Sequence, residues 1–225
     1  MATRRAFLST VGSSVLVIGC AGSSPGAGHP TPANGDEVTP VEDLMREHGV
    51  LRRVMFLYDE ASARFDARSE VPLDALASCA GIIRRVIEDY HEKLEENFLF
   101  PRFETAGKLA DLTATLRHQH HVGRALTEQI VALAKAPLAD SDRASLAAML
   151  RKFNRMYRAH AAREDTVLFP ELRGLVGPKA YKDLGDEFEA KETQMLGDRG
   201  FEHAVADVGK LEQAFGVGEL ASLTP

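Results

Sequence analysis

Apolar residues recur along most of the chain at alternating steps of three and four, which is the spacing of one face of an α-helix. Four long segments between Val41 and Val167 carry this pattern, and strand-like alternation is almost absent. The pattern therefore predicts four long helices. Their inward apolar positions include Leu44, Leu51 and Met55; Leu76, Ile83 and Ile87; Leu112, Leu116 and Ile130; and Leu146, Leu150 and Phe153.

Helix-breaking residues separate these segments, and they include Pro72, Gly107, Pro137 and Pro170. Ser141 is expected to cap the fourth helix. Short connections favour antiparallel neighbours, so we predict an all-α protein whose residues 41–171 form an up-down antiparallel four-helix bundle. Residues 178–197 and 200–215 carry two shorter amphipathic patterns, which predict a helical extension over 172–225 that flanks the bundle.

Residues 1–20 are predicted to be a signal peptide, because a basic start precedes a short apolar stretch. Arg4 and Arg5 resemble the twin-arginine export motif, and the residues before Cys20 resemble a lipoprotein cleavage box. We therefore expect an exported lipoprotein, periplasmic or otherwise extracytoplasmic, whose lipid on Cys20 is its single membrane contact. The alternative is a chance Arg pair before a generic signal peptide.

Residues 21–40 are rich in Gly, Pro, Ser and Ala, so they are expected to form a flexible linker. His29 lies in this linker and is expected to be solvated. With Cys20 lipidated, Cys79 is left alone on a helical pattern, where it is expected to be a small core residue.

Composition narrows the range of functions further. The chain is 44% apolar and 27% charged, an ordinary globular balance, and its formal net charge is −6. This charge argues against a nucleic-acid partner, which would need clustered Lys and Arg. Two cysteines exclude a disulfide-dense fold and a Cys₄ zinc site. No apolar run is long enough for a membrane span.

The chain also contains an internal repeat. Residues His91–Pro101 and His160–Pro170 share the pattern His-x-x-x-Glu-acid-x-x-Leu-Phe-Pro. A single His precedes each of them on the helix before, within Glu47-His48 and within Gln119-His120. Each half is therefore a helix hairpin that carries one His and then a His-x-x-x-Glu pair.

This repeat predicts a metal site. His and Glu four residues apart lie on one helix face, and inward polar groups are costly unless they have partners. Imidazole and carboxylate suit iron, zinc and manganese, and two bridging carboxylates can hold two cations. Taken singly, each His has an ordinary alternative as a hydrogen-bonded core residue, and each His-x-x-x-Glu as a surface ion pair. The candidate metal ligands are His48, His91, Glu95, His120, His160 and Glu164.

The same residues resemble the hemerythrin-like (HHE cation-binding) family of bacterial type. The resemblance implies a non-haem centre of two iron ions, oxo- or hydroxo-bridged, with the four His as terminal ligands and Glu95 and Glu164 as bridges. It implies binding of, or reaction with, a small oxidant such as oxygen, peroxide or nitric oxide. Non-catalytic iron binding, storage or sensing remains the alternative, and whether the protein is an enzyme stays open.

The chain departs from the invertebrate oxygen carriers of that family, which have a second His one turn from the first on the third helix. Here Leu116 and Arg124 lie at that spacing from His120, which argues against reversible oxygen carriage. His118 and His121 point away from the face of His120 and are expected on or near the surface.

Two kinds of side chain next to the candidate ligands have open roles. A nearby tyrosine either packs in the core or binds metal in place of the second His that the third helix lacks. For the second role Tyr157 is preferred over Tyr58. The acidic neighbours either accept hydrogen bonds from the ligand His or are solvated; they are Glu92, Glu96 and Asp165.

Overall fold

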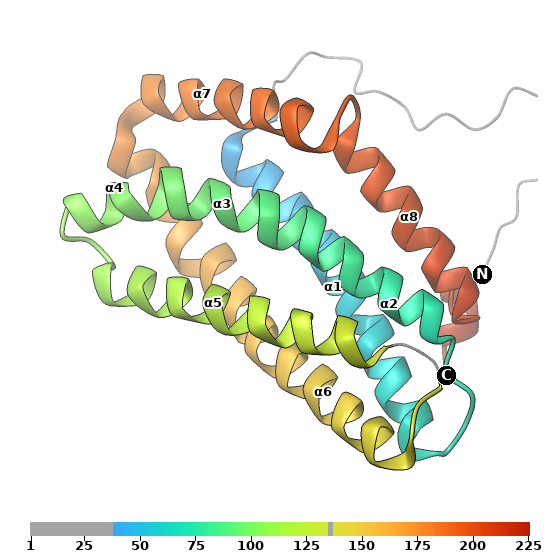
Figure 1. Cartoon of the computed structure of the whole chain (residues 1–225). Helices are drawn as coiled ribbons and strands as arrows, with labels where there is room; N and C mark the ends of the chain where they lie inside the picture. The colour runs from blue at the N-terminus through green and yellow to red at the C-terminus, as the bar shows by residue number, and fades with distance from the viewer. Residues whose placement is uncertain (1–37, 135–136) are drawn as a thin grey trace, which may run out of the picture. The chain divides into compact units, whose positions relative to one another are not determined.

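The computed structural model describes residues 38–134 and 137–225. The predicted signal peptide, Cys20, His29 and most of the predicted linker lie outside these residues. The described residues form helices and no strand (Figure 1), so the all-α prediction is confirmed.

The first helix is α1, Pro40–Asp66. It begins where the Thr39 side chain accepts a hydrogen bond from the Glu42 backbone nitrogen at 3.2 Å, and Pro40 occupies the first turn, where its missing N–H is not needed. A second helical rod runs without a break from Leu73 to Thr105. Its parts are α2 (Leu73–Ile82), the π-helical η1 (Ile83–His91), α3 (Glu92–Leu94), the π-helical η2 (Glu95–Leu99) and α4 (Phe100–Thr105).

The third rod is α5 (Ala110–Leu133), and the fourth is α6 (Asp140–Arg163) with the π-helical η3 (Glu164–Leu168). The prediction that Ser141 caps the fourth helix is wrong, because Ala139 holds the N-cap position and Ser141 lies inside the first turn. Acidic side chains of that turn face the positive end of the helix dipole and stabilise this earlier start.

Helical structure continues past Pro170, which lies in the first turn of α7 (Phe169–Leu196). The backbone leaves helical geometry at Gly177, whose φ of 79° is favourable for glycine, and Pro178 follows it. The last α-helix is α8, Gly200–Ala214, and a short 3₁₀ turn, η4 (Leu220–Leu223), comes after it.

The four rods pack in a ring. Helix α1 lies beside α6 and beside the α2–η1 part of the second rod, while α5 lies beside α6 and beside the second rod (Figure 1). Their inward apolar side chains form two buried groups. One surrounds Leu51, Leu76 and Leu150, and the other surrounds Phe100 and Leu116.

Helices α7 and α8 cover the side of α1 that the ring leaves open (Figure 1). Phe188 of α7 and Val208 of α8 are each buried in one of the two apolar groups. An ion pair of 2.6 Å between Arg53 and Glu212 joins α1 to α8. Because of this cover, α1 buries residues such as Leu57 that lie outside its single predicted face. Among the described helices, none is both long and apolar enough to cross a membrane.

Candidate metal centre

Both His-x-x-x-Glu pairs lie where the helix widens from α to π turns. The segment η2 begins at Glu95 and η3 begins at Glu164. Pro101 and Pro170 each follow as the second residue after the π segment. A proline lacks an N–H and its ring crowds the carbonyl four residues earlier, which favours a widened turn there. The repeated Leu-Phe-Pro sequence therefore shapes the backbone at both carboxylates.

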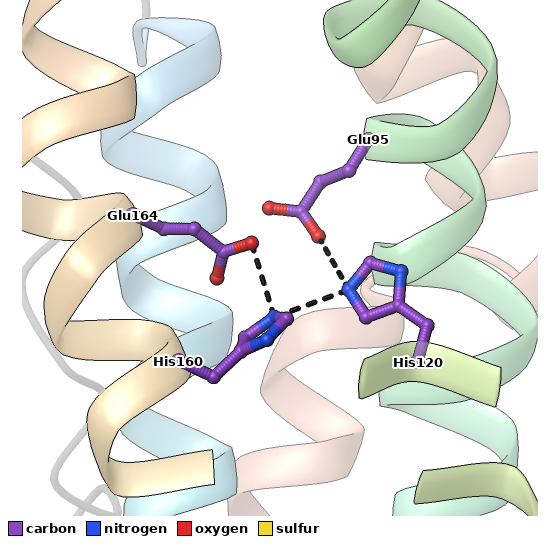
Figure 2. A group of neighbouring side chains, drawn as sticks. All are labelled: Glu95, His120, His160 and Glu164. Atoms are coloured by element: carbon purple, nitrogen blue, oxygen red, sulfur yellow. Dashed lines mark hydrogen bonds and ion pairs between the residues drawn. The ribbon is translucent and has the colours of Figure 1, made fainter. Parts of the chain in front are cut away.

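The structure brings the six candidate ligands together in two overlapping groups. We name the group of His48, His91 and Glu95 position A, and its ligand atoms lie within 4.8 Å of one another. We name the second group position B, and it meets the same criterion (Figure 2). Its members are Glu95, His120, His160 and Glu164.

The two carboxylates connect the halves of the repeat. Each contacts one imidazole of its own half and one of the other half through the Nε2 atoms. The N···O distances are 3.6 Å for His91–Glu95, 3.4 Å for His120–Glu95, 3.0 Å for His160–Glu164 and 3.4 Å for His48–Glu164. This near-twofold arrangement is compatible with a pair of bridged cations.

These side chains fit metal ions on chemical grounds. All six are at most 3% exposed. Neither oxygen of Glu95 and neither oxygen of Glu164 accepts a hydrogen bond from the described residues. Buried carboxylate oxygens without partners are costly, and a cation would compensate both groups at once. The set of imidazole and carboxylate donors suggests metal binding and suits iron, zinc or manganese.

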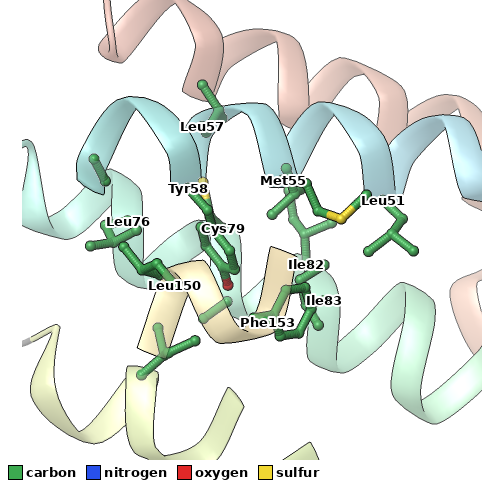
Figure 3. Close-up of a cluster of buried hydrophobic side chains, with 14 of the residues drawn as sticks. Leu51, Met55, Leu57, Tyr58, Leu76, Cys79, Ile82, Ile83, Leu150 and Phe153 are labelled. Carbon is green, nitrogen blue, oxygen red and sulfur yellow. The ribbon is translucent and has the colours of Figure 1, made fainter. Parts of the chain in front are cut away.

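Four other residues considered from the sequence lie away from this centre. Tyr58 is fully buried in the apolar group of Leu76, Cys79 and Leu150 (Figure 3), where burial raises the pKa of its hydroxyl well above the usual value. Cys79 is itself fully buried there, as predicted. His118 and His121 are exposed, which confirms the expectation that they face away from His120.

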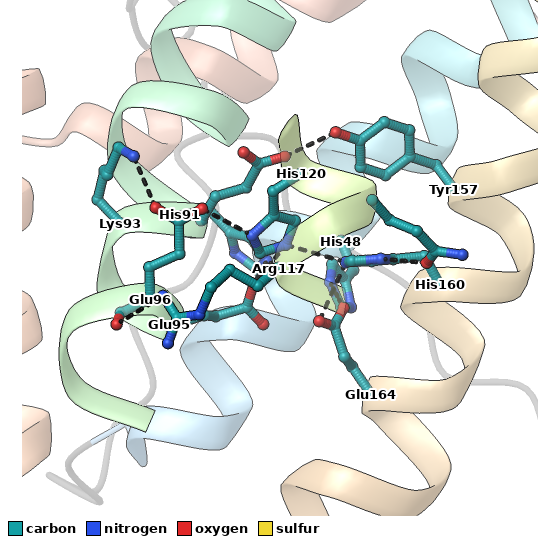
Figure 4. A network of polar contacts seen from close by, with 12 residues as sticks. His48, His91, Lys93, Glu95, Glu96, Arg117, His120, Tyr157, His160 and Glu164 are labelled. Carbon is teal, nitrogen blue, oxygen red and sulfur yellow. Dashed lines mark hydrogen bonds and ion pairs between the residues drawn. The ribbon is translucent and has the colours of Figure 1, made fainter. Parts of the chain in front are cut away.

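Each candidate ligand His has an oxygen acceptor at its other ring nitrogen, Nδ1. Figure 4 shows one of these pairs, His120 and Glu96. A hydrogen bond donated by Nδ1–H leaves the Nε2 lone pair free for a metal and orients the ring. The Nδ1···O distances are 2.7 Å for His48–Asp165, 2.6 Å for His91–Glu47, 3.1 Å for His120–Glu96 and 2.9 Å for His160–Gln119.

Sequence reasoning anticipated half of these acceptors. Glu96 and Asp165 accept hydrogen bonds from ligand His, which was one of the two alternatives left open for them. Glu47 and Gln119 were not predicted as acceptors from the sequence. The internal repeat carried a signal for the missed pair, because Glu47 and Gln119 occupy equivalent places directly before a ligand His. Glu92 accepts its hydrogen bond from Tyr157 and not from a ligand His, although its carboxylate lies within 4.8 Å of a ring nitrogen of His120.

The Tyr157 hydroxyl donates a hydrogen bond to Glu92 Oε1 at 2.7 Å (Figure 4). Glu92 also forms an ion pair of 2.7 Å with Arg124. The hydroxyl approaches α5 at Gly123, where a Cβ atom would lie 1.9 Å from it, so no larger residue fits there without a shift. Burial, and then Glu92, raise the pKa of Tyr157 well above its usual value. These contacts commit the hydroxyl to Glu92 in this arrangement.

The imidazoles differ in their affinity for protons. Burial lowers the pKa of His91 well below its usual value, and burial lowers the pKa of His120 to about 4 despite the Glu96 carboxylate. Burial also acts against the charged form of His48, but Asp165 and Glu164 outweigh it and raise the pKa of His48 to about 9. A metal ion at position A must therefore displace a proton from His48. The same negative charges attract a divalent cation more strongly than they attract a proton.

The two central carboxylates also differ. Burial, and then the nearby Glu164 carboxylate, raise the pKa of Glu95 well above its usual value. Burial opposes ionisation of Glu164 too, but His160 and His48 lower the pKa of Glu164 below its usual value. The pKa values of the two carboxyl groups are therefore shifted in opposite directions.

Comparison with known proteins agrees with this site. The hemerythrin HHE cation-binding domain matches residues 39–172, which contain all six candidate ligands. The chain is 42% identical over 217 residues to uncharacterized proteins of Mycobacterium bovis and Mycobacterium tuberculosis, an alignment that covers 94% of this chain and 85% of each relative. No solved structure matches the chain. The extent of the domain match, together with its buried His and Glu clusters, shows that this chain belongs to the hemerythrin HHE cation-binding family.

Proposed function

We propose that this protein is a non-haem di-iron protein that binds or reacts with a small oxidant, namely oxygen, peroxide or nitric oxide. One observation carries the proposal: two pairs of His surround two buried carboxylates whose four oxygens accept no hydrogen bond from the described residues. Family membership supports cation binding. The choice of iron, and of two ions, rests on the ligand chemistry and on the near-twofold arrangement.

In this proposal His48 and His91 hold one iron, His120 and His160 hold the other, and Glu95 and Glu164 lie between them. The bound ions would supply Lewis-acid and redox chemistry. The chain holds each imidazole in one orientation through its Nδ1 hydrogen bond and keeps bulk water away from the six ligands, which are at most 3% exposed.

Six side chains supply fewer ligands than two six-coordinate irons need. Tyr157 donates its hydroxyl to Glu92 and Tyr58 lies in an apolar group, so we propose that neither tyrosine completes the set. At least one position then stays open to an exchangeable ligand. Because the centre is buried, that ligand must be small, which favours a diatomic molecule or a peroxide.

The same burial favours a second candidate, a non-catalytic iron-binding, storage or sensing protein. A surface cavity of about 260 Å³ is lined by residues that include Arg52, Asp59 and Arg158, with no candidate ligand among its lining residues. A closed centre that admits no outside ligand would fit this role.

Spectroscopy separates the two candidates. We expect aerobically purified protein to contain two irons per chain and to absorb in the near ultraviolet, and we expect added azide or nitric oxide to change this spectrum. No visible phenolate-to-iron band should appear, because the Tyr157 hydroxyl is bonded to Glu92. A spectrum that ignores azide and nitric oxide in both redox states would favour storage or sensing, and turnover of peroxide would identify an enzyme.

We also propose the finer architecture. The ring of α1, the α2–α4 rod, α5 and α6 is taken as an up-down antiparallel four-helix bundle over residues 41–171, with α7 and α8 as the flanking extension. The contacts of neighbouring rods and the short connections between them support this arrangement.

We further propose that residues 1–20 direct export of the folded, metal-loaded protein through a twin-arginine route, and that lipid on Cys20 anchors it outside the cytoplasm. The Arg4-Arg5 pair supports the route, and a core that holds buried carboxylates gives a reason to fold around metal first. Changing both Arg to Lys should leave precursor in the cytoplasm, measured by cell fractionation and immunoblotting. Normal export of this variant would contradict the route, and labelling with a radioactive fatty acid that Cys20→Ser abolishes would support the anchor.

A further inference from the structure

We propose that the two metal positions are inequivalent, that position A binds its ion more tightly than position B, and that Glu47 is the positioning residue that sets the difference. This inference rests on the proposed di-metal function and adds an order of loading to it. The observation that supports it is a difference between the two halves of the internal repeat. The residues that accept the Nδ1 hydrogen bonds of the ligand His are not the same in the two halves.

The clearest break is the pair Glu47 and Gln119. The two residues are equivalent in the repeat, and each accepts the Nδ1 hydrogen bond of the His in the His-x-x-x-Glu pair of its own half. Glu47 Oε2 lies 2.6 Å from His91 Nδ1, whereas Gln119 Oε1 lies 2.9 Å from His160 Nδ1. Position A therefore has a carboxylate where position B has a neutral amide.

The second pair of acceptors, Asp165 and Glu96, differs in the same direction. Asp165 lies 2.7 Å from His48 Nδ1 and forms an ion pair with one arginine, Arg52. Glu96 lies 3.1 Å from His120 Nδ1 and shares its charge with two cations. Those cations are Lys93 and Arg124, each 2.6 Å from a Glu96 oxygen.

Glu47 is buried among charged groups of α1 and α7. Glu47 is 1% exposed on α1, with Asp43 one turn before it and Glu192 of α7 on the far side. Tyr90 of η1 also faces Glu47, and Arg46 is the cation among its neighbours.

In the proposed centre Glu95 and Glu164 are shared by both ions, so the acceptors at Nδ1 determine the order of affinity. A carboxylate that accepts the Nδ1–H of a ligand His raises the basicity of the imidazole and adds negative charge near the cation. A neutral amide orients the ring without adding charge. Loss of such an acceptor typically lowers metal affinity by about 10- to 100-fold.

Calorimetric titration of the metal-free protein with Zn²⁺ at a fixed pH tests the inference. We expect two ions per chain in two steps, the first about 10-fold tighter or more. Glu47→Gln should weaken the first step by about 10- to 100-fold, and Gln119→Glu should strengthen the second. The double variant should bind first at position B, so that in this background His160→Ala removes the tighter step. Glu128→Gln, an exposed change of the same kind on α5, should leave both steps unchanged.

The outcomes are distinct. Two native steps of equal affinity, or two steps that change by less than about twofold in both Glu47→Gln and Gln119→Glu, overturn the inference and leave the di-metal proposal standing. Fewer than two ions per native chain overturns the proposed di-metal function itself. Should Glu47→Gln lose its helical circular dichroism, Gln119→Glu decides alone, because it adds a carboxylate instead of removing one.

Discussion

Replacing His91 or His160 with alanine should remove most of the iron from the purified protein. Each side chain directs Nε2 toward a central carboxylate, at 3.6 Å from Glu95 and 3.0 Å from Glu164 respectively. In the proposed di-iron centre each is a ligand of a set that has one His fewer than the invertebrate oxygen carriers have. The loss leaves an ion with one imidazole, which weakens binding well beyond the loss of an outer hydrogen bond. Iron per chain, measured on protein purified identically to the native form, checks this result.

His118→Ala and His121→Ala are the matched controls, because both side chains are exposed on the same helix as His120. They should retain native iron. Near-native iron in both His91→Ala and His160→Ala would remove these two His from the ligand set, and a large loss in either control would show that the face of α5 toward the centre is wrongly assigned.

Replacing Glu95 with methionine should stabilise the metal-free protein and destabilise the metal-loaded one. Glu95 is fully buried, and neither of its oxygens accepts a hydrogen bond from the described residues, so an apolar side chain of similar size removes a cost of about 1–3 kcal/mol. The native protein regains more than this on loading, since free metal at 1,000 times its Kd contributes about 4.1 kcal/mol per site. Thermal unfolding with chelator and with metal should rank the two proteins in opposite orders.

Glu164→Met is the matched control, because Glu164 is the equivalent of Glu95 in the second half of the repeat. The pKa of Glu164 is lowered by His160 and His48, so its removal takes one of two carboxylate partners from His48 and should destabilise the metal-free protein. If both variants stabilise the metal-free protein equally, the two carboxylates do not differ as the pKa directions require. If Glu95→Met gains stability from metal as the native protein does, Glu95 is not a ligand.

The four long helices and their inward faces were predictable, because the helical period of 3.6 residues determines which positions share a face. That period also separates His120 from His118 and His121, and the exposure of the latter two agrees with it. Helix ends were less predictable. A proline is tolerated in a first turn, so Pro170 marks the start of α7 instead of the end of a helix, and Ser141 was one of several polar residues able to cap α6.

The acceptors behind the imidazoles were only partly predictable. Glu96 and Asp165 stand next to candidate ligands in the sequence, but which His each one serves depends on contacts between different helices. Glu47 meets His91 across 44 positions and Asp165 meets His48 across 117, and no local pattern encodes such pairs. The bond from Tyr157 to Glu92 is of the same kind, and it requires the small residue Gly123 on a third helix.

The sequence by itself therefore determined the helical class, the internal repeat and the six candidate ligands, because periodicity and residue chemistry are local properties. Tertiary structure alone decided which imidazoles Glu95 and Glu164 contact and which oxygen accepts the hydrogen bond of each Nδ1. It also decided how α7 and α8 bury the remaining face of α1. The physical reason is that these features depend on distances between helices, and such distances arise only when the apolar faces pack together.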